Sequence, residues 1–171
     1  AEIEAFRQQY KTLADLYSGT PEEQQGAILI DAHYAGNAIG ATCTARPEDT
    51  EIAPDGSLYI AFTSGSSGSD GGADTRIFKG PKGQIPYEFG FIMHLRETNN
   101  DPAAMTFRWD MLALGGEPAE GGLGFSNRDN LLFDRSGNLW MVNDMSSAKM
   151  NRAVPKRIDG DKPVSQSDLR G

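Results

Sequence analysis

The first 40 residues carry apolar positions at helical spacing. Apolar and aromatic side chains recur every three or four positions, at Ile3, Phe6, Tyr10, Leu13 and Tyr17. This spacing predicts a helix over residues 1–18. A second helix is expected after Thr20, because Thr20 can cap it, Pro21 suits its first turn and Glu23 can complete a capping box. Gly36 and Gly40 are expected to end this helical region.

After Thr44 the pattern changes to short apolar segments separated by turn-rich stretches such as APDGS and DRSGN. Segments of this kind predict strands. The expected strands are Leu58–Thr63, Glu88–Glu97, Met105–Leu114, Leu131–Phe133 and Leu139–Val142. The chain is therefore expected to divide into a helical N-terminal segment or insertion, residues 1–43, and a mainly β region, residues 44–171.

Two of these β segments share one pattern, PEDTEIAPDGSLYIAFT and NRDNLLFDRSGNLWMVND. With a one-residue slip at the turn, the aligned pairs are Asp49 with Asp129, Ile52 with Leu132, Gly56 with Gly137, Leu58 with Leu139 and Tyr59 with Trp140. Any two β-hairpins share some of this pattern, but a repeated hairpin is typical of β-propeller blades. Since a blade takes about 40–45 residues, the offset of about 80 indicates either two blades or one blade with long insertions.

The fold class expected from this pattern is mainly β, a partial β-propeller of about two or three blades. The chain is too short for a full ring after its helical start, so we expect it to be a piece of a larger propeller or an incomplete ring. Exposed blade edges in such a piece would favour pairing between copies of the chain, a homo-oligomer. Trp109 and Trp140 are expected in the core or between blades, and His33 and His94 in structural roles.

Composition narrows the classes of partner. The formal net charge of −8 argues against a nucleic-acid backbone as a ligand. No apolar run approaches the ~20 residues that a membrane-spanning helix needs, so no membrane partner is expected. The single cysteine, Cys43, permits no disulfide within the chain and is expected as a small buried side chain.

The stretch TARPEDTE carries the candidate chemistry. In propellers, the loop that enters the innermost strand of each blade faces the central funnel, and both copies of the repeat place an acidic residue there. Convergent carboxylates repel unless a cation lies between them. Oxygen atoms suited to calcium or magnesium are offered by Glu48, Asp49, Asp129 and Asn130.

Arg46 adds an anion-binding group beside these acids. Pro47 favours an extended Arg46, so the side chains of Arg46 and Glu48 would point the same way. The planar guanidinium matches phosphate oxygens, which predicts a phosphate site at Arg46. The alternative is that Arg46 only forms an ion pair with Glu48 or Asp49 on the surface.

Three stretches together resemble the PhoX-type alkaline phosphatases: GATCTARPEDTEIAPDGSLYIAFTSG, NNDPAAMTFRWDMLALGGEP and FSNRDNLLFDRSGNLWMVND. The resemblance runs from about Gly40 to Asp144, the middle and later part of such a protein. It implies a β-propeller phosphomonoesterase exported through the twin-arginine route, hence a periplasmic or extracellular protein. It also implies a cluster of Fe³⁺ and Ca²⁺ as the cofactor and phosphate monoesters as the substrates.

The resemblance further implies roles for individual residues. Arg46 matches the family's phosphate-contacting arginine, and Glu48 matches a metal ligand. Asp129 and Asn130 are carried over as further ligands, although Arg128 stands where the family usually has proline. Other ligands of the family's cluster, including a cysteine that Cys43 does not match, come from an earlier part of the family's chain. We therefore expect the chain alone to be inactive and its metal site incomplete.

A second reading of the same residues stays open. A non-catalytic propeller module that binds calcium or a protein partner would share the fold and the acidic residues but would lack the phosphatase chemistry. Hydrolysis of p-nitrophenyl phosphate, tested with and without calcium and iron, discriminates the two functions.

Overall fold

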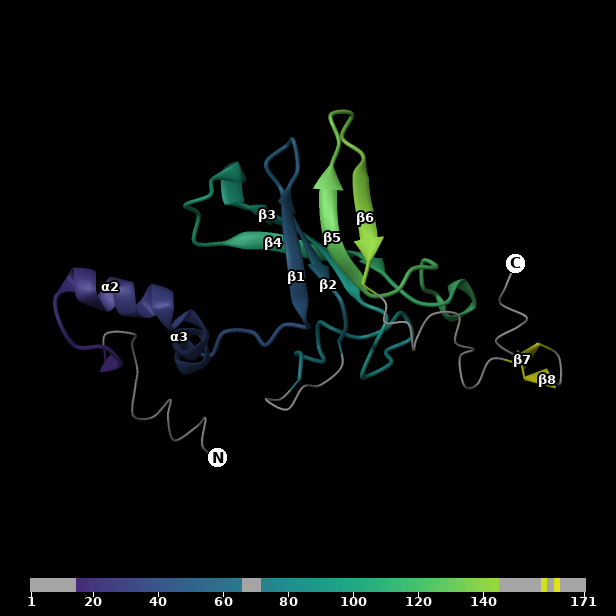
Figure 1. The fold of residues 1–171 in the computed structure, drawn as a ribbon, viewed down its shortest axis with the longest axis horizontal. Helices are drawn as coiled ribbons and strands as arrows, with labels where there is room; N and C mark the ends of the chain where they lie inside the picture. Colours follow the sequence, from purple (N-terminus) through teal and green to yellow (C-terminus); the bar gives the residue numbers. More distant parts are fainter. Residues whose placement is uncertain (1–14, 66–71, 145–157, 160–161, 164–171) are drawn as a thin grey trace. The chain divides into compact units, whose positions relative to one another are not determined.

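A computed structural model of the chain describes residues 15–65, 72–144, 158–159 and 162–163 (Figure 1). The chain divides into two compact units, Ala1–Cys43 and Thr44–Gly171. Each unit is described by itself below. None of the described helices is both long and apolar enough to cross a membrane.

The first unit contains two consecutive helices, α2 (Pro21–Ile30) and α3 (Ala32–Ile39). The Thr20 hydroxyl accepts the Glu23 N–H and the Glu23 carboxylate accepts the Thr20 N–H, so the predicted capping box is confirmed. Gly40 ends α3 with φ of 72°, a conformation that glycine adopts without strain.

Two helix predictions need correction or lie outside the described residues. Gly36 does not end a helix: it lies inside α3, and the helical path is interrupted earlier, at Asp31. Most of the helix predicted over residues 1–18 falls outside the described part of the chain, and Tyr17 and Ser18 at its end are not helical.

The second unit is built on a four-stranded antiparallel sheet in which each strand pairs with the next along the chain (Figure 1). Its strands are β1 (Pro47–Ile52), β2 (Leu58–Phe62), β3 (Phe91–Glu97) and β4 (Phe107–Leu114). Two short 3₁₀ helices, η2 (Thr98–Asn100) and η3 (Pro118–Glu120), lie in the connections that precede and follow β4. The described residues are thus mainly β, as predicted.

A second antiparallel hairpin follows, β5 (Arg128–Phe133) and β6 (Leu139–Asn143). A short pair, β7 (Ile158–Asp159) and β8 (Lys162–Pro163), ends the described chain. The strands predicted after Thr44 are all present, with ends moved by up to three residues. The sequence prediction left β1 out of its strands, because PEDTEI carries three acidic residues where strands usually carry apolar ones.

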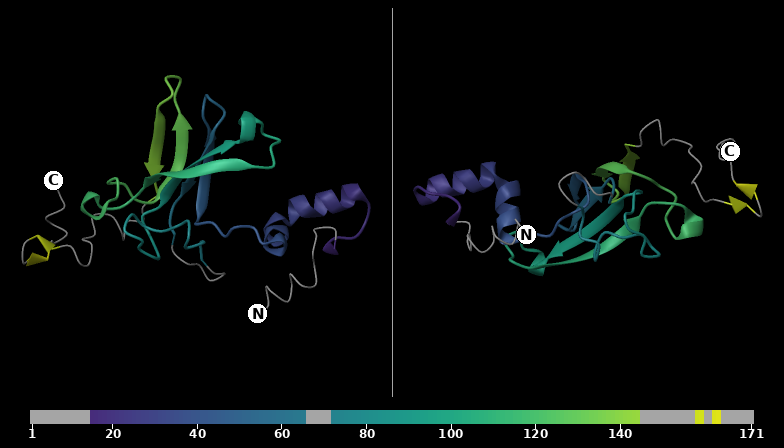
Figure 2. Two further views of the ribbon diagram at one scale, coloured as in Figure 1. Left: turned by 180° about the vertical axis from the view of Figure 1, so that it is seen from behind. Right: turned by 90° about the horizontal axis from the view of Figure 1, so that it is seen from below.

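The four-stranded sheet buries a different cluster on each face. One face packs Phe62, Phe78, Tyr87 and Phe91 into a core that residues 72–90 help to build. The other face packs Ala61, Ile92 and Ala113 against Leu131 of β5 and Phe125. The β5–β6 hairpin therefore lies on one face of the larger sheet, and Figure 2 shows its turn at the same end as the β1–β2 turn.

The structure also decides how the repeat is aligned. Pro47 pairs with Phe62 and Arg128 with Asn143, while Ile52 pairs with Leu58 and Phe133 with Leu139. The two hairpins are therefore equivalent at a constant offset of 81 residues, obtained from 128 minus 47 and from 133 minus 52. The one-residue slip predicted at the turn is wrong, and Glu48, rather than Asp49, is the equivalent of Asp129.

The offset between the two hairpins corresponds to one four-stranded sheet. The β1–β2 hairpin belongs to a single four-stranded sheet, so β3, β4 and their connections lie between the two hairpins along the chain. The described strands form no closed ring, so a complete propeller stays a prediction.

The expectation that Cys43 is a buried side chain is wrong. Cys43 is exposed, because it lies in the connection between the two units. Trp109 and Trp140 are 43% and 61% exposed, so neither side chain lies in a core formed by the described residues, and their packing between blades stays a prediction.

Candidate active site at the start of strands β1 and β5

Arg46 and Glu48 form an ion pair at the start of β1. The Arg46 Nη2 lies 3.0 Å from the Glu48 Oε1. A surface ion pair of Arg46 with Glu48 or Asp49 was the alternative to a phosphate site. The Arg46 side chain is nevertheless 65% exposed, against 29% for Glu48. The guanidinium thus has one acidic neighbour and a wide solvent-facing surface on which an anion can be bound.

A β-bulge presents Glu48. The pairing of β1 with β2 shifts by one residue between Pro47 and Asp49, which leaves Glu48 as the extra residue. The pairing of β5 with β6 shifts in the same way between Arg128 and Leu131, where the equivalent residue is Asp129. Bulges redirect side chains and are frequent beside active sites. Two acidic residues therefore occupy equivalent bulges at the starts of two strands.

Strands β1 and β5 lie side by side and run in the same direction. The Asp49 Oδ2 accepts the N–H of Leu131 at 2.8 Å, and the Glu51 Oε1 accepts the N–H of Phe133 at 3.3 Å. Both contacts join residues 82 apart, so the starts of the two strands, and with them Glu48 and Asp129, lie at the same end.

Asp49 consequently has a structural role that the sequence did not reveal. Its second carboxylate oxygen, Oδ1, accepts the Thr50 N–H at 2.9 Å, so both oxygens of Asp49 bind backbone N–H groups. Although Asp49 was one of the four candidate oxygen ligands, its carboxylate is already used to attach β5 to β1.

Thr63 connects the two candidate segments. Its N–H donates to the Arg46 carbonyl at 2.9 Å, and its hydroxyl donates to the Arg128 carbonyl at 3.0 Å. Its own carbonyl accepts Nδ2 of Asn127 at 3.0 Å. One threonine at the end of β2 therefore fixes the backbone beside Arg46 and the backbone beside Asp129.

Asn127 strengthens this junction from within the core. It is buried, adopts φ of 51° and also donates Nδ2 to the Glu88 carbonyl at 3.1 Å. Asparagine tolerates this left-handed conformation better than most residues. Neither Thr63, the last residue of a predicted strand, nor Asn127 was predicted as part of the site, because Thr63 binds Arg128, and Asn127 binds Thr63, more than 60 positions away along the chain.

Arg128 occupies the position before Asp129. Its guanidinium lies 4.2 Å from the centre of the Phe125 ring, a cation–π contact. Burial lowers the pKa of Arg128, and its buried Nε has no hydrogen-bond partner among the residues that the structure describes. Arg128 therefore faces the interior at Phe125, whereas Asp129 is half-buried and Asn130 is exposed.

The donor set is incomplete for a metal cluster. Glu48, Asp129 and Asn130 supply the oxygen atoms that calcium prefers. Within the part of the chain that the structure describes, however, no three His, Cys, Asp or Glu side chains gather into a metal-binding group. These residues can therefore supply only part of the ligands of a metal centre.

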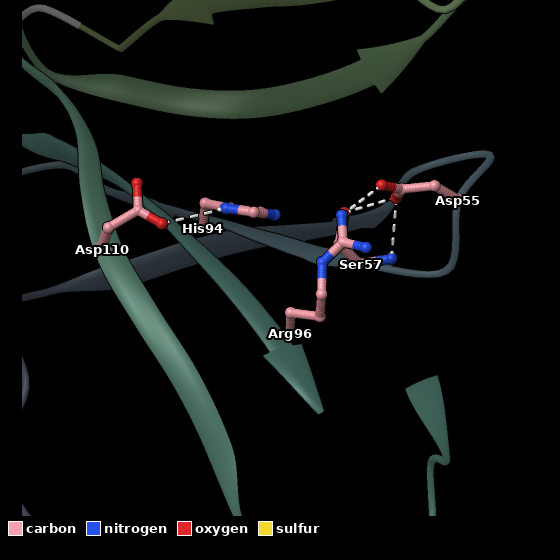
Figure 3. A network of polar contacts seen from close by, with 5 residues as sticks. All are labelled: Asp55, Ser57, His94, Arg96 and Asp110. Atoms are coloured by element: carbon pink, nitrogen blue, oxygen red, sulfur yellow. Dashed lines mark hydrogen bonds and ion pairs between the residues drawn. The ribbon is translucent and has the colours of Figure 1, made fainter. Parts of the chain in front are cut away.

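A second polar network lies at the opposite end of the sheet, at the β1–β2 turn (Figure 3). Arg96 of β3 forms an ion pair with Asp55, and the hydrogen bonds that Ser57 donates are the main cause that lowers the pKa of Asp55 to about 2. Nearby, the His94 Nδ1 lies 3.1 Å from the Asp110 Oδ1. These contacts tie strands to one another, which agrees with a structural role for His94.

Comparison with known proteins adds one finding to this geometry. Residues 10–162 match the family model described as alkaline phosphatase PhoX. Neither the curated proteins nor the solved structures gave a match.

Proposed function

The chain belongs to the PhoX alkaline phosphatase family, and from this premise we propose that Arg46 and Glu48 belong to the phosphate-binding and metal-binding site of a phosphomonoesterase. Membership of the family implies alkaline phosphatase activity, a hydrolase reaction on phosphate esters. The assignment of that activity to particular residues rests on the geometry at the starts of β1 and β5.

One observation carries the proposal: Glu48 and Asp129 occupy equivalent bulges at the same end of neighbouring strands. Through Thr63, the Arg46 backbone is held at this same end. A cationic side chain and two carboxylates thus meet the requirements of a site that binds an anion through an arginine and a cation through oxygen atoms.

Arg46 has the electrostatic role in the proposed reaction. Negative charge is spread over the phosphoryl oxygens while the ester bond breaks, and a positioned guanidinium stabilises that charge. Its exposed surface is open to a phosphate monoester, while the ion pair with Glu48 holds the side chain near the bulge. We assign no leaving-group preference to the site.

Glu48, Asp129 and Asn130 would contribute oxygen ligands to a cluster of Fe³⁺ and Ca²⁺. When bound, such a cluster supplies Lewis-acid polarisation of the phosphoryl group. Because the described residues provide only part of a ligand set, we propose that the chain alone is inactive and that the remaining ligands come from elsewhere in the intact protein. We further propose export to the periplasm or the exterior, as is expected of this family.

The test is hydrolysis of p-nitrophenyl phosphate by the intact protein, with and without added calcium and iron. We expect Arg46→Ala to lower kcat/KM by about 100-fold or more, as loss of a group that stabilises transition-state charge does. Arg76→Ala is the matched control, because Arg76 is also exposed and also pairs with an acidic residue two positions away, Asp74.

Two outcomes would contradict the proposal. Equal rates for Arg46→Ala, Arg76→Ala and the unmodified protein would remove Arg46 from the site. A folded protein that hydrolyses no phosphate ester under any metal condition would instead support the non-catalytic binding module.

A further inference from the structure

One half of one sheet face carries a row of apolar side chains that the described residues leave half-buried, at Leu58 and Leu95, or exposed, at Ile52 and Trp109. Ile52, Leu58, Leu95 and Trp109 are directly opposite one another across the four strands, in a single row. We call them the apolar row. Ile52 is 69% exposed and Phe107, near the end of the row, is 55% exposed. On the same face, residues 72–90 contribute to a cluster that contains Phe62, Phe91 and Met93 but none of the four row residues.

The outer face of the β5–β6 hairpin is also apolar and uncovered. Leu131, Leu139 and Met141 point toward the four-stranded sheet. Leu132, Trp140 and Val142 alternate with them along the strands and are 55% to 61% exposed. We call these three residues the hairpin face.

The repeat relates the two surfaces to the interface between the β5–β6 hairpin and the four-stranded sheet. At the offset of 81, Leu139 and Met141 of the hairpin are equivalent to Leu58 and Ile60 of the larger sheet. The side of the hairpin that packs on the larger sheet is therefore equivalent to the side that bears the apolar row.

The complementary surfaces correspond in the same way. Trp140 and Val142 on the hairpin face are equivalent to Tyr59 and Ala61. Ala61 is fully buried against the hairpin, and Tyr59 makes an edge contact with Phe133 at 5.1 Å between ring centres. The hairpin face is thus equivalent to the surface of the larger sheet on which the β5–β6 hairpin packs.

We propose that the chain binds a second copy of itself head to tail, with the apolar row of one copy packed on the hairpin face of the next. The contact would reproduce between chains the packing of β5–β6 on the larger sheet within one chain. It uses two different surfaces, so a dimer still has one free apolar row and one free hairpin face, and the association continues beyond a dimer. The faces of the sheets, rather than their edge strands, make the contact.

The test is the mass of the full chain in solution, measured by light scattering and sedimentation over a range of concentrations in a reducing buffer. We expect the average mass to rise at least twofold with concentration. Trp109→Lys places a charge in the apolar row, and Leu132→Lys places a charge in the hairpin face. Leu123→Lys is the matched control, because Leu123 is also an exposed leucine but lies in the loop before β5.

Each lysine lowers the net negative charge of −8 by one, so a loss of association cannot come from stronger overall repulsion. We expect Trp109→Lys and Leu132→Lys each to stay monomeric, and the control to associate like the unmodified chain. Mixed in equal amounts, the two monomeric variants should form a dimer and nothing larger, because each retains one intact surface. Circular dichroism shows whether each variant is folded.

Three results would overturn the proposal. The unmodified chain could remain monomeric at all concentrations, as it would if each surface were covered by another part of the same chain. One of the two surface variants could associate as well as the control does. The mixture of folded variants could stay monomeric, which would exclude a contact between these two different surfaces.

Discussion

At the scale of single residues, Asp134 shows how a carboxylate stabilises a turn. It accepts hydrogen bonds from the side chains of Trp140 and Asn138 and from the N–H groups of Ser136 and Asn138. These bonds, with that of Trp140 the largest contribution, hold the pKa of Asp134 well below its usual value. The ionised form of Asp134 therefore stabilises the β5–β6 hairpin.

This lowered pKa predicts a pH-dependent effect of Asp134→Ala. Because the carboxyl pKa is lower in the folded state, its contribution is complete above the unfolded pKa of about 3.9 and disappears as the pH falls through the folded value. We expect Asp134→Ala to lower Tm at pH 7 and to lower it progressively less below about pH 4. Thermal unfolding monitored by circular dichroism measures this difference.

Asp134→Asn provides the control for Asp134→Ala. Asparagine retains an oxygen acceptor but does not ionise, so the Tm difference between Asp134→Asn and Asp134→Ala should not follow the carboxyl titration. A Tm deficit of Asp134→Ala that is the same at pH 7 and at pH 3 would show that the charge of Asp134 contributes nothing.

At the scale of elements, β5 is attached to β1 by side chains instead of a backbone ladder. Asp49 and Glu51 accept the N–H groups of Leu131 and Phe133. The Leu131 side chain is buried in the cluster between the two sheets. The packing of the hairpin therefore depends on acidic residues of β1, a strand that could not be recognised from its composition.

We expect Asp49→Ala to destabilise the protein by about 1–3 kcal/mol, because the Leu131 N–H loses its acceptor. Urea unfolding measures the free energy, and hydrogen exchange should show faster exchange at Leu131. Glu51→Ala is the comparison, and its effect should be smaller since its contact is longer, at 3.3 Å. Unchanged exchange at Leu131 in folded Asp49→Ala would contradict this role of Asp49.

Local sequence patterns account for most elements but not for their contacts. Turn residues and apolar alternation located five strands and the paired hairpins, and Thr20, Pro21 and Glu23 located the start of α2. Strand β1 escaped prediction because its acidic residues bind backbone groups of β5, a contact that only the folded chain creates.

In the candidate site, too, local patterns identified residues but not the contacts between them. Arg46, Glu48 and Asp129 were chosen from short motifs, but the sequence alignment paired Asp129 with Asp49, and only the strand register shows that Glu48 is its equivalent. The junction at Thr63 joins residues about 65 positions apart, beyond the reach of any local pattern.

At the scale of the whole molecule, the two units are expected to unfold independently. Each is compact by itself, and the division falls between Cys43 and Thr44. Both tryptophans of the chain, Trp109 and Trp140, belong to the second unit, so tryptophan fluorescence reports on that unit alone.

A chain that begins at Thr44 should therefore keep the fluorescence-detected Tm of the full chain within experimental error. Circular dichroism of the same two proteins should show the loss of the helical signal of α2 and α3. A lower fluorescence Tm in the shortened chain would mean that the first unit stabilises the sheets.

The exposed Cys43 has a practical consequence for every experiment on this chain. It is the only cysteine, so oxidation can form a disulfide only between two molecules. Such a covalent dimer would be joined through Cys43, the last residue of the first unit, and would use neither apolar surface. Air-exposed samples could thus contain two kinds of dimer of equal mass, and only the covalent kind would disappear on addition of a thiol.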